Sequence, residues 1–318
     1  KLLLSYYAAV IEHVGPKITL TYCDTDVLFL FLAKLFPAIK FFSFQNGVRV
    51  KGFSPYFEFN YLNKLDVMNF YYYVFGDKEL DIITKISGVS LSVQSIGSVA
   101  ASYADSCYRQ EYARKYSKRT IYFISCWRKR DYHRNDEYGK QQKAMLTSLL
   151  LCLQFLSQYC INHKYNVAVI PATDEYLEEE KQFYRNALKN TTVNFLLRDR
   201  LNFSSYKTVL QSDILIAQDS TLGAEAIGMN KKLLCAIYQQ RPLFNPYFGY
   251  ATNNHIWYTS IKSYDVFEKK LSYLIKMPQE AYEEEISHVK CYFMNNSKCH
   301  PAHKIIEEKI ASVLRGSE

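Results

Sequence analysis

The sequence predicts an α/β protein with two Rossmann-like, doubly wound domains that face a cleft. Short apolar runs alternate with amphipathic segments along most of the 318 residues, a length that suffices for two domains. Polar residues gather directly after the apolar runs, where the strand ends of an open parallel sheet form a ligand crevice. The alternation stops at a basic stretch, 108–119, which we expect to be the linker between two domains, and then restarts. We therefore expect a first domain at 1–117, a second at 118–288 and a helical C-terminal segment at 289–318.

Composition and charge exclude several classes of protein. With 48% hydrophobic residues the chain can bury a substantial core, which disordered chains cannot. The net charge of +8 is dispersed along the sequence and suits anionic partners such as sugar nucleotides, phospholipid headgroups or nucleic acid, without choosing among them. No nucleic-acid recognition module appears, so we expect no nucleic-acid partner. The eight cysteines form no CxxC pair, which argues against a zinc site and against a disulfide framework.

Membrane-spanning and targeting segments are not predicted. The longest apolar run, 27–42, is interrupted by Lys34, Pro37 and Lys40 and is shorter than the roughly 18 to 20 residues that cross a bilayer. We expect a cytoplasmic protein that associates peripherally with the inner face of the membrane. The chain opens without Met and in a helical pattern at 5–13, so we expect an N-terminally truncated first domain.

The expected elements follow from hydrophobic periodicity and from Gly and Pro. Gly15-Pro16 stops the first helix and Pro37 the second, because proline cannot continue a helix. In the first domain we expect helices at 5–13, 27–36 and 78–86 and strands at 18–23, 40–44, 69–75 and 92–96. In the second we expect strands at 120–125, 166–171, 193–197, 214–217 and 233–237, and helices at 141–160, 175–188, 204–211 and 222–229. Closing helices are expected at 264–275, 279–288 and 302–314.

The strongest local motif is the stretch 212–234, in which a buried strand leads through a polar turn into a short helix. Asp219, Ser220 and Thr221 lie in this turn, and Glu225 lies one turn into the helix. Such a turn aims backbone N–H groups and the positive helix end at one point, where an anion can bind. Glu225 can accept hydrogen bonds from ribose hydroxyls there. The alternative is an ordinary βα unit whose Ser or Thr only caps the helix.

Two carboxylates, Asp24 and Asp26, follow the first predicted strand. A carboxylate at this place can be a general base for an acceptor hydroxyl or a nucleophile toward a sugar carbon. The alternative is that one of them caps the helix that begins near Val27. We favour capping for Asp26, with substrate binding as its alternative role, and chemistry for Asp24.

The second strand ends in another polar cluster, which contains Gln45, Asn46 and Arg49. Amide side chains suit sugar hydroxyls, and the planar fork of an Arg suits a carboxylate or a phosphate. A simple turn explains Asn46-Gly47 equally well. The presence of Arg49 favours a site.

The first strand of the second domain ends at Ser125, and Arg128 follows three residues later. Backbone amides together with an Arg can hold a diphosphate or a phosphate ester at such a strand end. The alternative is a solvated basic loop.

Five stretches, in this order, together resemble a known family. They are ITLTYCDTD at 18–26, FFSFQNGVR at 41–49, IYFISCWR at 121–128, the stretch 212–234 and the closing segment 244–285. They resemble the bacterial surface-carbohydrate biosynthesis proteins, glycosyltransferases of the two-domain GT-B type that build capsule, O-antigen or lipopolysaccharide. The family is also similar to capsule transferases that use Kdo-type donors. It often has Asp-Asn where this chain has Asp24-Thr25.

The resemblance implies a metal-independent glycosyltransferase that moves a sugar from a nucleotide-sugar donor to a glycan or lipid-linked glycan acceptor. No cofactor is implied, and CMP-, UDP- and GDP-linked donors remain open. The residues that would hold the nucleotide and its phosphate lie in the second domain: Ser125, Arg128, Asp219, Ser220, Thr221 and Glu225. Those that would face the reacting sugar or the acceptor lie in the first domain: Asp24, Asn46 and Arg49 as catalytic residues, and Gln45 and Asp26 as substrate-binding residues.

Two other functions fit the same architecture. A sugar-nucleotide 2-epimerase shares the two-domain plan but needs several carboxylates and a His around the sugar, and these are sparse in the sequence. A non-catalytic subunit that binds nucleotide-sugar or glycan within a polysaccharide assembly complex is the other. Fold alone does not choose among them.

Overall fold

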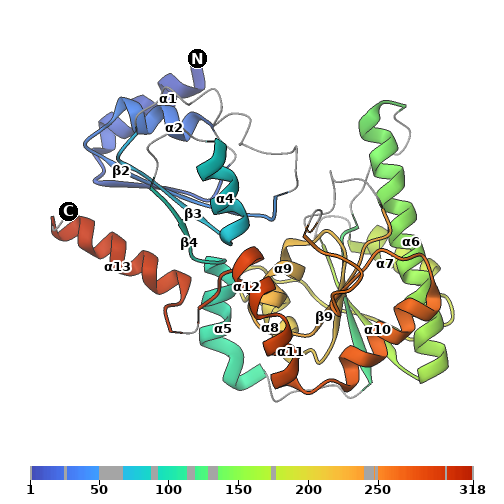
Figure 1. The fold of residues 1–318 in the computed structure, drawn as a ribbon. Coiled ribbons are helices and arrows are strands. Elements are labelled where there is room, and N and C mark those ends of the chain that lie inside the picture. The colour runs from blue at the N-terminus through green and yellow to red at the C-terminus, as the bar shows by residue number, and fades with distance from the viewer. Residues whose placement is uncertain are drawn as a thin grey trace. The chain divides into compact units, whose positions relative to one another are not determined.

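The computed structural model describes residues 2–24, 27–49, 67–86, 92–112, 119–127, 135–172, 177–239, 247, 250–297 and 299–316. The chain divides into two compact units. Lys1–Tyr103 and His288–Glu318 form the first unit, and Ala104–Ser287 form the second. Each unit contains a parallel β-sheet with helices packed on it, which confirms the predicted α/β fold class (Figure 1).

The first unit is built on a parallel sheet in the order β1-β2-β3-β4. The strands are β1 (Ile18–Thr21), β2 (Lys40–Phe44), β3 (Phe70–Val74) and β4 (Ser92–Ser95). The helices of this unit are α1 (Leu2–Val14), α2 (Val27–Leu35), α4 (Asp77–Ile86) and α13 (Ala302–Arg315). Successive side chains of a strand point to opposite faces of the sheet. Phe41 and Tyr72 therefore pack with α2, whereas Phe42 and Tyr73 pack with α13, so both faces are buried.

The C-terminal segment is part of the first unit. After α12 (Ser287–Phe293), the Asn295 backbone N–H donates to the Phe75 carbonyl at 2.7 Å, and the Asn296 Oδ1 accepts from the Ser98 backbone N–H at 3.1 Å. The structure therefore groups His288–Glu318 with the first unit, whereas the sequence predicted a separate segment at 289–318. The division near residue 103 also differs from the predicted boundary at 117.

The second unit has a six-stranded parallel sheet in the order β10-β9-β8-β5-β6-β7. Its strands are β5 (Thr120–Ile124), β6 (Asn166–Ile170), β7 (Val193–Phe195), β8 (Leu215–Ala217), β9 (Leu233–Ala236) and β10 (Tyr258–Thr259). Its helices are α6 (Glu137–His163), α7 (Leu177–Ala187), α8 (Ser204–Gln211), α9 (Thr221–Gly228), α10 (Tyr264–Lys276) and α11 (Gln279–Glu285). The chain proceeds outward from β5 to β7 and then outward the other way from β8 to β10. The strand order therefore reverses between β5 and β8, which is the doubly wound arrangement.

Three predicted elements differ from the structure. Helix α5 (Val99–Tyr112) takes up part of the stretch predicted as a linker, because its polar residues lie on an exposed face while Ala101 and Ala104 are buried. The helix predicted at 279–288 is divided at Ile286 into α11 and α12. The two-residue strand β10 was not predicted, since two residues carry no periodicity.

Helix α6 contains a segment, Gln142–His163, that is long and apolar enough to cross a membrane by length and composition. The expectation that no such segment exists was therefore wrong. Half of its most apolar window is buried within the structure, and Leu149, Leu153 and Leu156 belong to the core. A core helix passes the same test, so the segment is weak evidence for membrane insertion.

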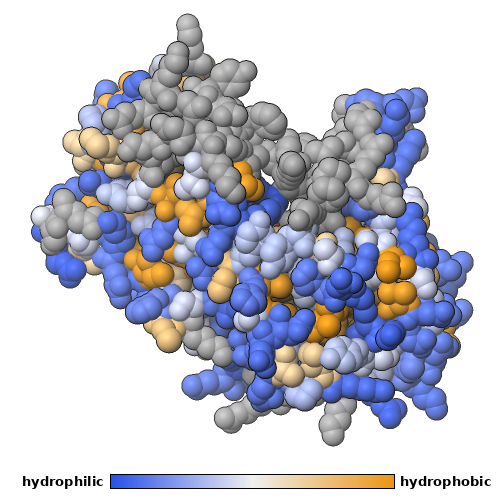
Figure 2. All heavy atoms as spheres, in the orientation of Figure 1, coloured by the Kyte–Doolittle hydropathy of each residue, from blue (hydrophilic) through white to orange (hydrophobic). Residues whose placement is uncertain are grey.

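On the face drawn in Figure 2, hydrophobic residues occur as small groups among hydrophilic ones.

Candidate functional site

The carboxyl ends of β5 and β8 in the second unit meet at the point where the strand order reverses. Ligands of open α/β sheets bind outside the carboxyl ends of the strands at such a point. Ser125 directly follows β5, and Gln218 directly follows β8. The Cys126 Sγ donates to the Gln218 Oε1 at 3.9 Å, which joins the two strand ends. Four of the predicted nucleotide residues, Ser125, Asp219, Ser220 and Thr221, therefore flank this switch point.

Ser125 is held by the fold itself. Its Oγ accepts from the Tyr184 hydroxyl at 2.8 Å and from the Trp127 backbone N–H at 3.1 Å. Ser125 is buried, so its side chain shapes the strand end and is less suited to contact a ligand directly.

The turn after β8 sets the start of α9. Ser220 occupies the N-cap position, as predicted, but its side chain makes no capping hydrogen bond within the described residues. A Cβ at Gly223 would lie 2.9 Å from the Ala217 Cβ, so glycine lets the helix approach the strand closely. The half-buried Ser220 and Thr221 therefore lie at a helix end whose N–H groups and dipole favour an anion.

Glu225 lies in the interior of α9 and is 5% exposed. Its Oε1 accepts from the Tyr206 hydroxyl of α8 at 3.0 Å, which fixes the position of the carboxylate. A buried carboxylate held in this way keeps acceptor capacity on its oxygens. The structure thus places Glu225, Ser220 and Thr221 on one short helix at the switch point.

A second cluster of predicted residues lies at the strand ends of the first unit. Asp24 and Arg49 form an ion pair, with side chains that are 0% and 13% exposed. The other carboxylate oxygen of Asp24 accepts from the Tyr72 hydroxyl at 2.8 Å. Both oxygens of Asp24 are therefore engaged, which favours a role in holding Arg49 over a role as a general base.

The amides of Gln45 and Asn46 complete this cluster. The Gln45 Oε1 accepts from the Phe75 backbone N–H at 2.7 Å, and its Nε2 donates to the Gly47 carbonyl at 2.9 Å. The Asn46 Oδ1 accepts from the Arg49 guanidinium at 3.3 Å. Three predicted residues of the first domain, Asp24, Asn46 and Arg49, thus form a hydrogen-bonded group, and Gln45 holds the neighbouring backbone.

Two charged residues that the sequence analysis did not single out, Lys78 and Glu79, border the same cluster at the start of α4. The Lys78 Nζ donates to the Arg49 carbonyl at 2.7 Å. Burial lowers the pKa of Lys78. Burial raises the pKa of Glu79, and the charge of Lys78 and a hydrogen bond with Gln45 oppose that rise. The signal was available, because Gly76-Asp77-Lys78-Glu79 is a polar group directly after a strand. Tyr72 carried no such signal, since it lies inside an aromatic strand.

Replacing Glu79 with glutamine is expected to stabilise the protein relative to wild type by an amount that grows as the pH rises above 4.5, the ordinary pKa of Glu. The folded-state pKa of Glu79 is raised, so between these two pKa values the folded state binds more protons than the unfolded state. Wild-type stability therefore falls across that window, and glutamine does not titrate. Urea unfolding at pH 5 and pH 7 measures the difference, with the exposed Glu308→Gln as control. A difference that shrinks toward pH 7 would contradict the expected effect.

Two predicted residues, Asp26 and Arg128, lie outside the described residues.

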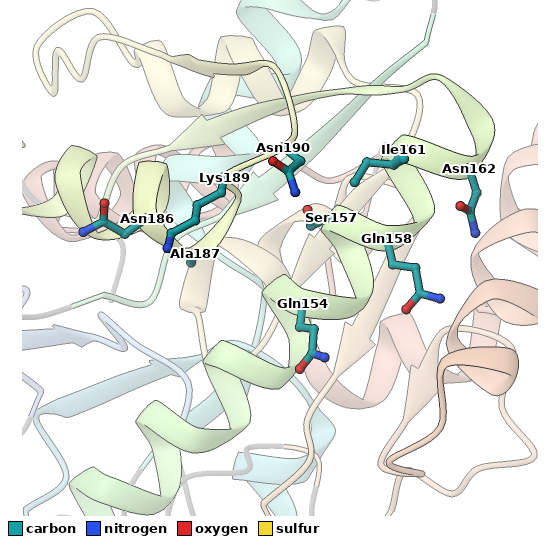
Figure 3. Close-up of a pocket in the computed structure, with 9 residues that line it drawn as sticks. All are labelled: Gln154, Ser157, Gln158, Ile161, Asn162, Asn186, Ala187, Lys189 and Asn190. Atoms are coloured by element: carbon teal, nitrogen blue, oxygen red, sulfur yellow. The ribbon is translucent and has the colours of Figure 1, made fainter.

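A separate shallow hollow of about 320 Å³ lies in the second unit between α6 and the end of α7 (Figure 3). Side-chain amides dominate its lining, but none of the predicted site residues belongs to it. It is not part of the switch-point site.

A comparison with protein families identifies one match. The family described as "putative O-antigen biosynthesis protein" matches residues 28–302, which is most of the chain. No curated protein matches the sequence.

Solved structures of similar fold include transferases and epimerases. A glycosyltransferase from Rickettsia africae ESF-5 has a TM-score of 0.54 and 14% identity, over 98% of this chain and 80% of that one. The UDP-GlcNAc 2-epimerase from Neisseria meningitidis, bound to UDP-GlcNAc, has a TM-score of 0.56 and 16% identity, over 97% and 80%. The wall teichoic acid polymerase TagF, soaked with CDPG, has a TM-score of 0.53 and 14% identity, over 95% and 73%. At these identities the likeness shows the GT-B fold that such proteins share.

Proposed function

Because this chain belongs to the O-antigen biosynthesis family, we propose that it is a glycosyltransferase that moves a sugar from a nucleotide-sugar donor to a growing surface glycan. The observation that carries the proposal is the switch point of the second unit, where α9 begins beside the end of β5. In a chain of this family, a helix start at that place suits the phosphates of a nucleotide.

The donor is proposed to bind along the start of α9. Backbone N–H groups at Ser220 and Thr221 face the phosphates, where the helix dipole favours negative charge. Glu225 accepts from the ribose hydroxyls, and Asp219 and Ser125 shape the turn around them. Arg128 is proposed to lie near the phosphate. The binding experiment below shows which of UDP, CMP and GDP the donor carries. A Kdo-type donor would require CMP.

The first unit is proposed to bind the reacting sugar or the acceptor. Asp24 holds Arg49, and the guanidinium of Arg49 suits an anionic group on either substrate. Gln45 and Asn46 place amides beside it, which suits sugar hydroxyls. Glu79, whose pKa burial raises, is a proton-exchanging group at the same strand ends. Stabilisation of the leaving phosphate by helix N–H groups and cationic side chains makes the reaction metal-independent in this proposal.

We also propose a cytoplasmic location with peripheral association at the inner face of the membrane. Helix α1 supports this, because Leu2, Tyr6 and Val14 are 90%, 63% and 65% exposed. Apolar side chains exposed on a helix suit the boundary of a lipid headgroup layer.

Replacing Glu225 with glutamine is expected to weaken nucleotide binding by roughly 10- to 100-fold, the effect of losing a hydrogen bond to a charged acceptor. Thermal-shift titration with UDP, CMP and GDP measures this. The variant keeps an oxygen that can accept from Tyr206, so its fold is preserved. Tyr206→Phe is the control, because it removes the hydrogen bond between Tyr206 and Glu225 and leaves the carboxylate.

The outcome of that titration decides the proposal. Stabilisation of wild type and Tyr206→Phe by one nucleotide, with loss in Glu225→Gln, supports it. If none of the three nucleotides stabilises wild type, the donor site is wrong. Incubating the protein with a sugar-linked form of the nucleotide that binds, and with no acceptor, tests the epimerase alternative. An epimerase converts its nucleotide-sugar without any acceptor.

A further inference from the structure

The second unit has a hollow of about 410 Å³ at the edge of its sheet opposite to the switch point. Thr120 is the first residue of β5, Ile214 directly precedes β8, and Lys232 directly precedes β9, and all three line the hollow. The residues proposed for the nucleotide lie at the other ends of the same strands. The two places are therefore separate sites on one sheet.

Four cationic side chains line this hollow: Arg109, Arg119, Lys231 and Lys232. They come from α5, from the residue before β5 and from the two residues before β9, so tertiary folding brings them together. The acidic residues of the lining are Asp213 and Glu283, and Asp105 behind the lining pairs with Arg109, so the four cationic groups exceed the three acidic ones by one. Such an excess within a concave surface attracts anions.

The cations are held in place by carbonyl groups. Arg109 donates to the Met229 carbonyl at 2.6 Å, Lys231 to the Leu210 carbonyl at 3.0 Å, and Lys232 to the Met277 carbonyl. A carbonyl orients an ammonium group without cancelling its charge, whereas the Arg109 guanidinium also forms an ion pair with Asp105 at 2.6 Å. Lys231 is 8% exposed, so the surrounding structure holds its side chain in place.

Two lining residues have an uncommon backbone conformation. Arg119 has a φ of +63° and Asn230 a φ of +57°, in the left-handed region that non-glycine residues enter rarely. Asparagine tolerates this region, but arginine has no such preference. Outliers of this kind cluster at ligand sites, where the surrounding structure holds them.

We propose that this hollow binds the phosphate group of a small phosphorylated metabolite of sugar-phosphate size. Arg119 and Lys232 contact the phosphate, and Lys231 lies beneath it. The amides of Gln279 and Asn230 are available to sugar hydroxyls, while Ile214 and Ile275 provide apolar surface for the ring. The volume is within the usual range of small-molecule sites, about 300 to 1,000 Å³.

The site is expected to depend on pH. Burial and the neighbouring Arg109 lower the pKa of Lys231 to about 8, and a bound anion favours its charged form. The other charged groups around it are Asp105 on α5, Asp213 before β8, Lys232 beside it, Arg119 before β5 and Glu283 on α11. Phosphate esters are dianionic above about pH 6, so the charge of the ligand does not change between pH 7 and pH 9. A fall in affinity across that range would therefore come from loss of the proton of Lys231.

Isothermal titration with glucose 1-phosphate tests the proposal on the full chain. The double variant Arg119→Gln, Lys232→Gln is expected to bind at least roughly tenfold more weakly than wild type, since each removed charge takes a charge-assisted hydrogen bond with it. Both residues are less buried than Lys231, so the fold is kept. Lys189→Gln removes one exposed charge elsewhere on the second unit, and Glu225→Gln alters only the donor site. Both are expected to bind as wild type does.

Each outcome decides the question. Weaker binding of glucose 1-phosphate by the double variant alone, together with a loss of wild-type affinity toward pH 9, supports the metabolite site. Equal weakening in Glu225→Gln would place the probe at the donor site and overturn the proposal. No binding by wild type would overturn it too. Co-sedimentation with phosphatidylglycerol vesicles but not phosphatidylcholine vesicles, in the absence of glucose 1-phosphate binding, would assign the charges to a lipid surface instead.

Discussion

Replacing Asp24 with alanine is expected to lower the free energy of unfolding by about 3 to 5 kcal/mol, the usual cost of removing one partner of a buried ion pair. The Asp24 side chain is 0% exposed and that of Arg49 is 13% exposed, so solvent cannot replace the lost carboxylate. The Tyr72 hydroxyl loses its acceptor at the same time. Urea unfolding followed by circular dichroism measures the effect.

Two variants give the scale for that measurement. Tyr72→Phe removes only one hydrogen bond to Asp24 and is expected to cost about 1 kcal/mol. Glu307→Gln breaks an exposed ion pair with Lys304 and is expected to leave stability unchanged. If Asp24→Ala costs no more than Tyr72→Phe, the ion pair does not organise the strand ends of the first unit.

Replacing Gly76 with alanine is expected to cost about 3 kcal/mol or more, at the upper end of the range for overpacking. An added Cβ would lie directly against the Tyr292 carbonyl oxygen and 2.7 Å from the Phe293 carbonyl carbon. Both are backbone atoms, so no side chain can rotate away. The end of α12 must move, and the hydrogen bond from Asn295 to Phe75 just beyond it is expected to break. Faster amide hydrogen exchange at Asn295, together with urea unfolding, checks this.

Gly15→Ala is the matched control for Gly76→Ala. Gly15 has a φ of +59° and nothing within 4 Å of an added Cβ, so only backbone strain of about 1 to 2 kcal/mol is expected. A cost for Gly76→Ala no larger than this would show that the C-terminal segment is not packed closely against the end of β3.

The local part of the fold could be predicted from sequence, because its signals are local. The polar clusters after β1 and β2 were found by a simple rule, since parallel strands end at one edge of the sheet. That rule predicted that Asp24, Asn46 and Arg49 lie close together. The same rule, applied to the end of β3, would have found Lys78 and Glu79.

Other features depend on long-range packing, which the sequence does not display. Tyr72 lies in the aromatic strand FYYYV, where only the register against β2 decides which rings face Asp24. The return of 288–318 to the first unit depends on contacts about 200 residues apart, such as Asn296 with Ser98. The basic stretch predicted as a linker, 108–119, begins within the last turn of α5, whose buried residues Ala101 and Ala104 precede that stretch.

The engaged state of Asp24 also changed the proposed division of roles. The sequence placed chemistry on Asp24, whereas the geometry gives it Arg49 and Tyr72 as partners. Its predicted catalytic role is not tested by this. The geometry favours Arg49 as the group that contacts substrate, with Asp24 as the residue that positions it.

A crystal structure of the protein with a bound nucleotide tests the central claim most directly. Crystals soaked separately with UDP, CMP and GDP are expected to show one of them at the switch point of the second unit. Its phosphates should lie at the first turn of α9, and its ribose hydroxyls should lie within hydrogen-bond distance of Glu225. A nucleotide bound away from α9, or none bound in any of the three soaks, would contradict the account.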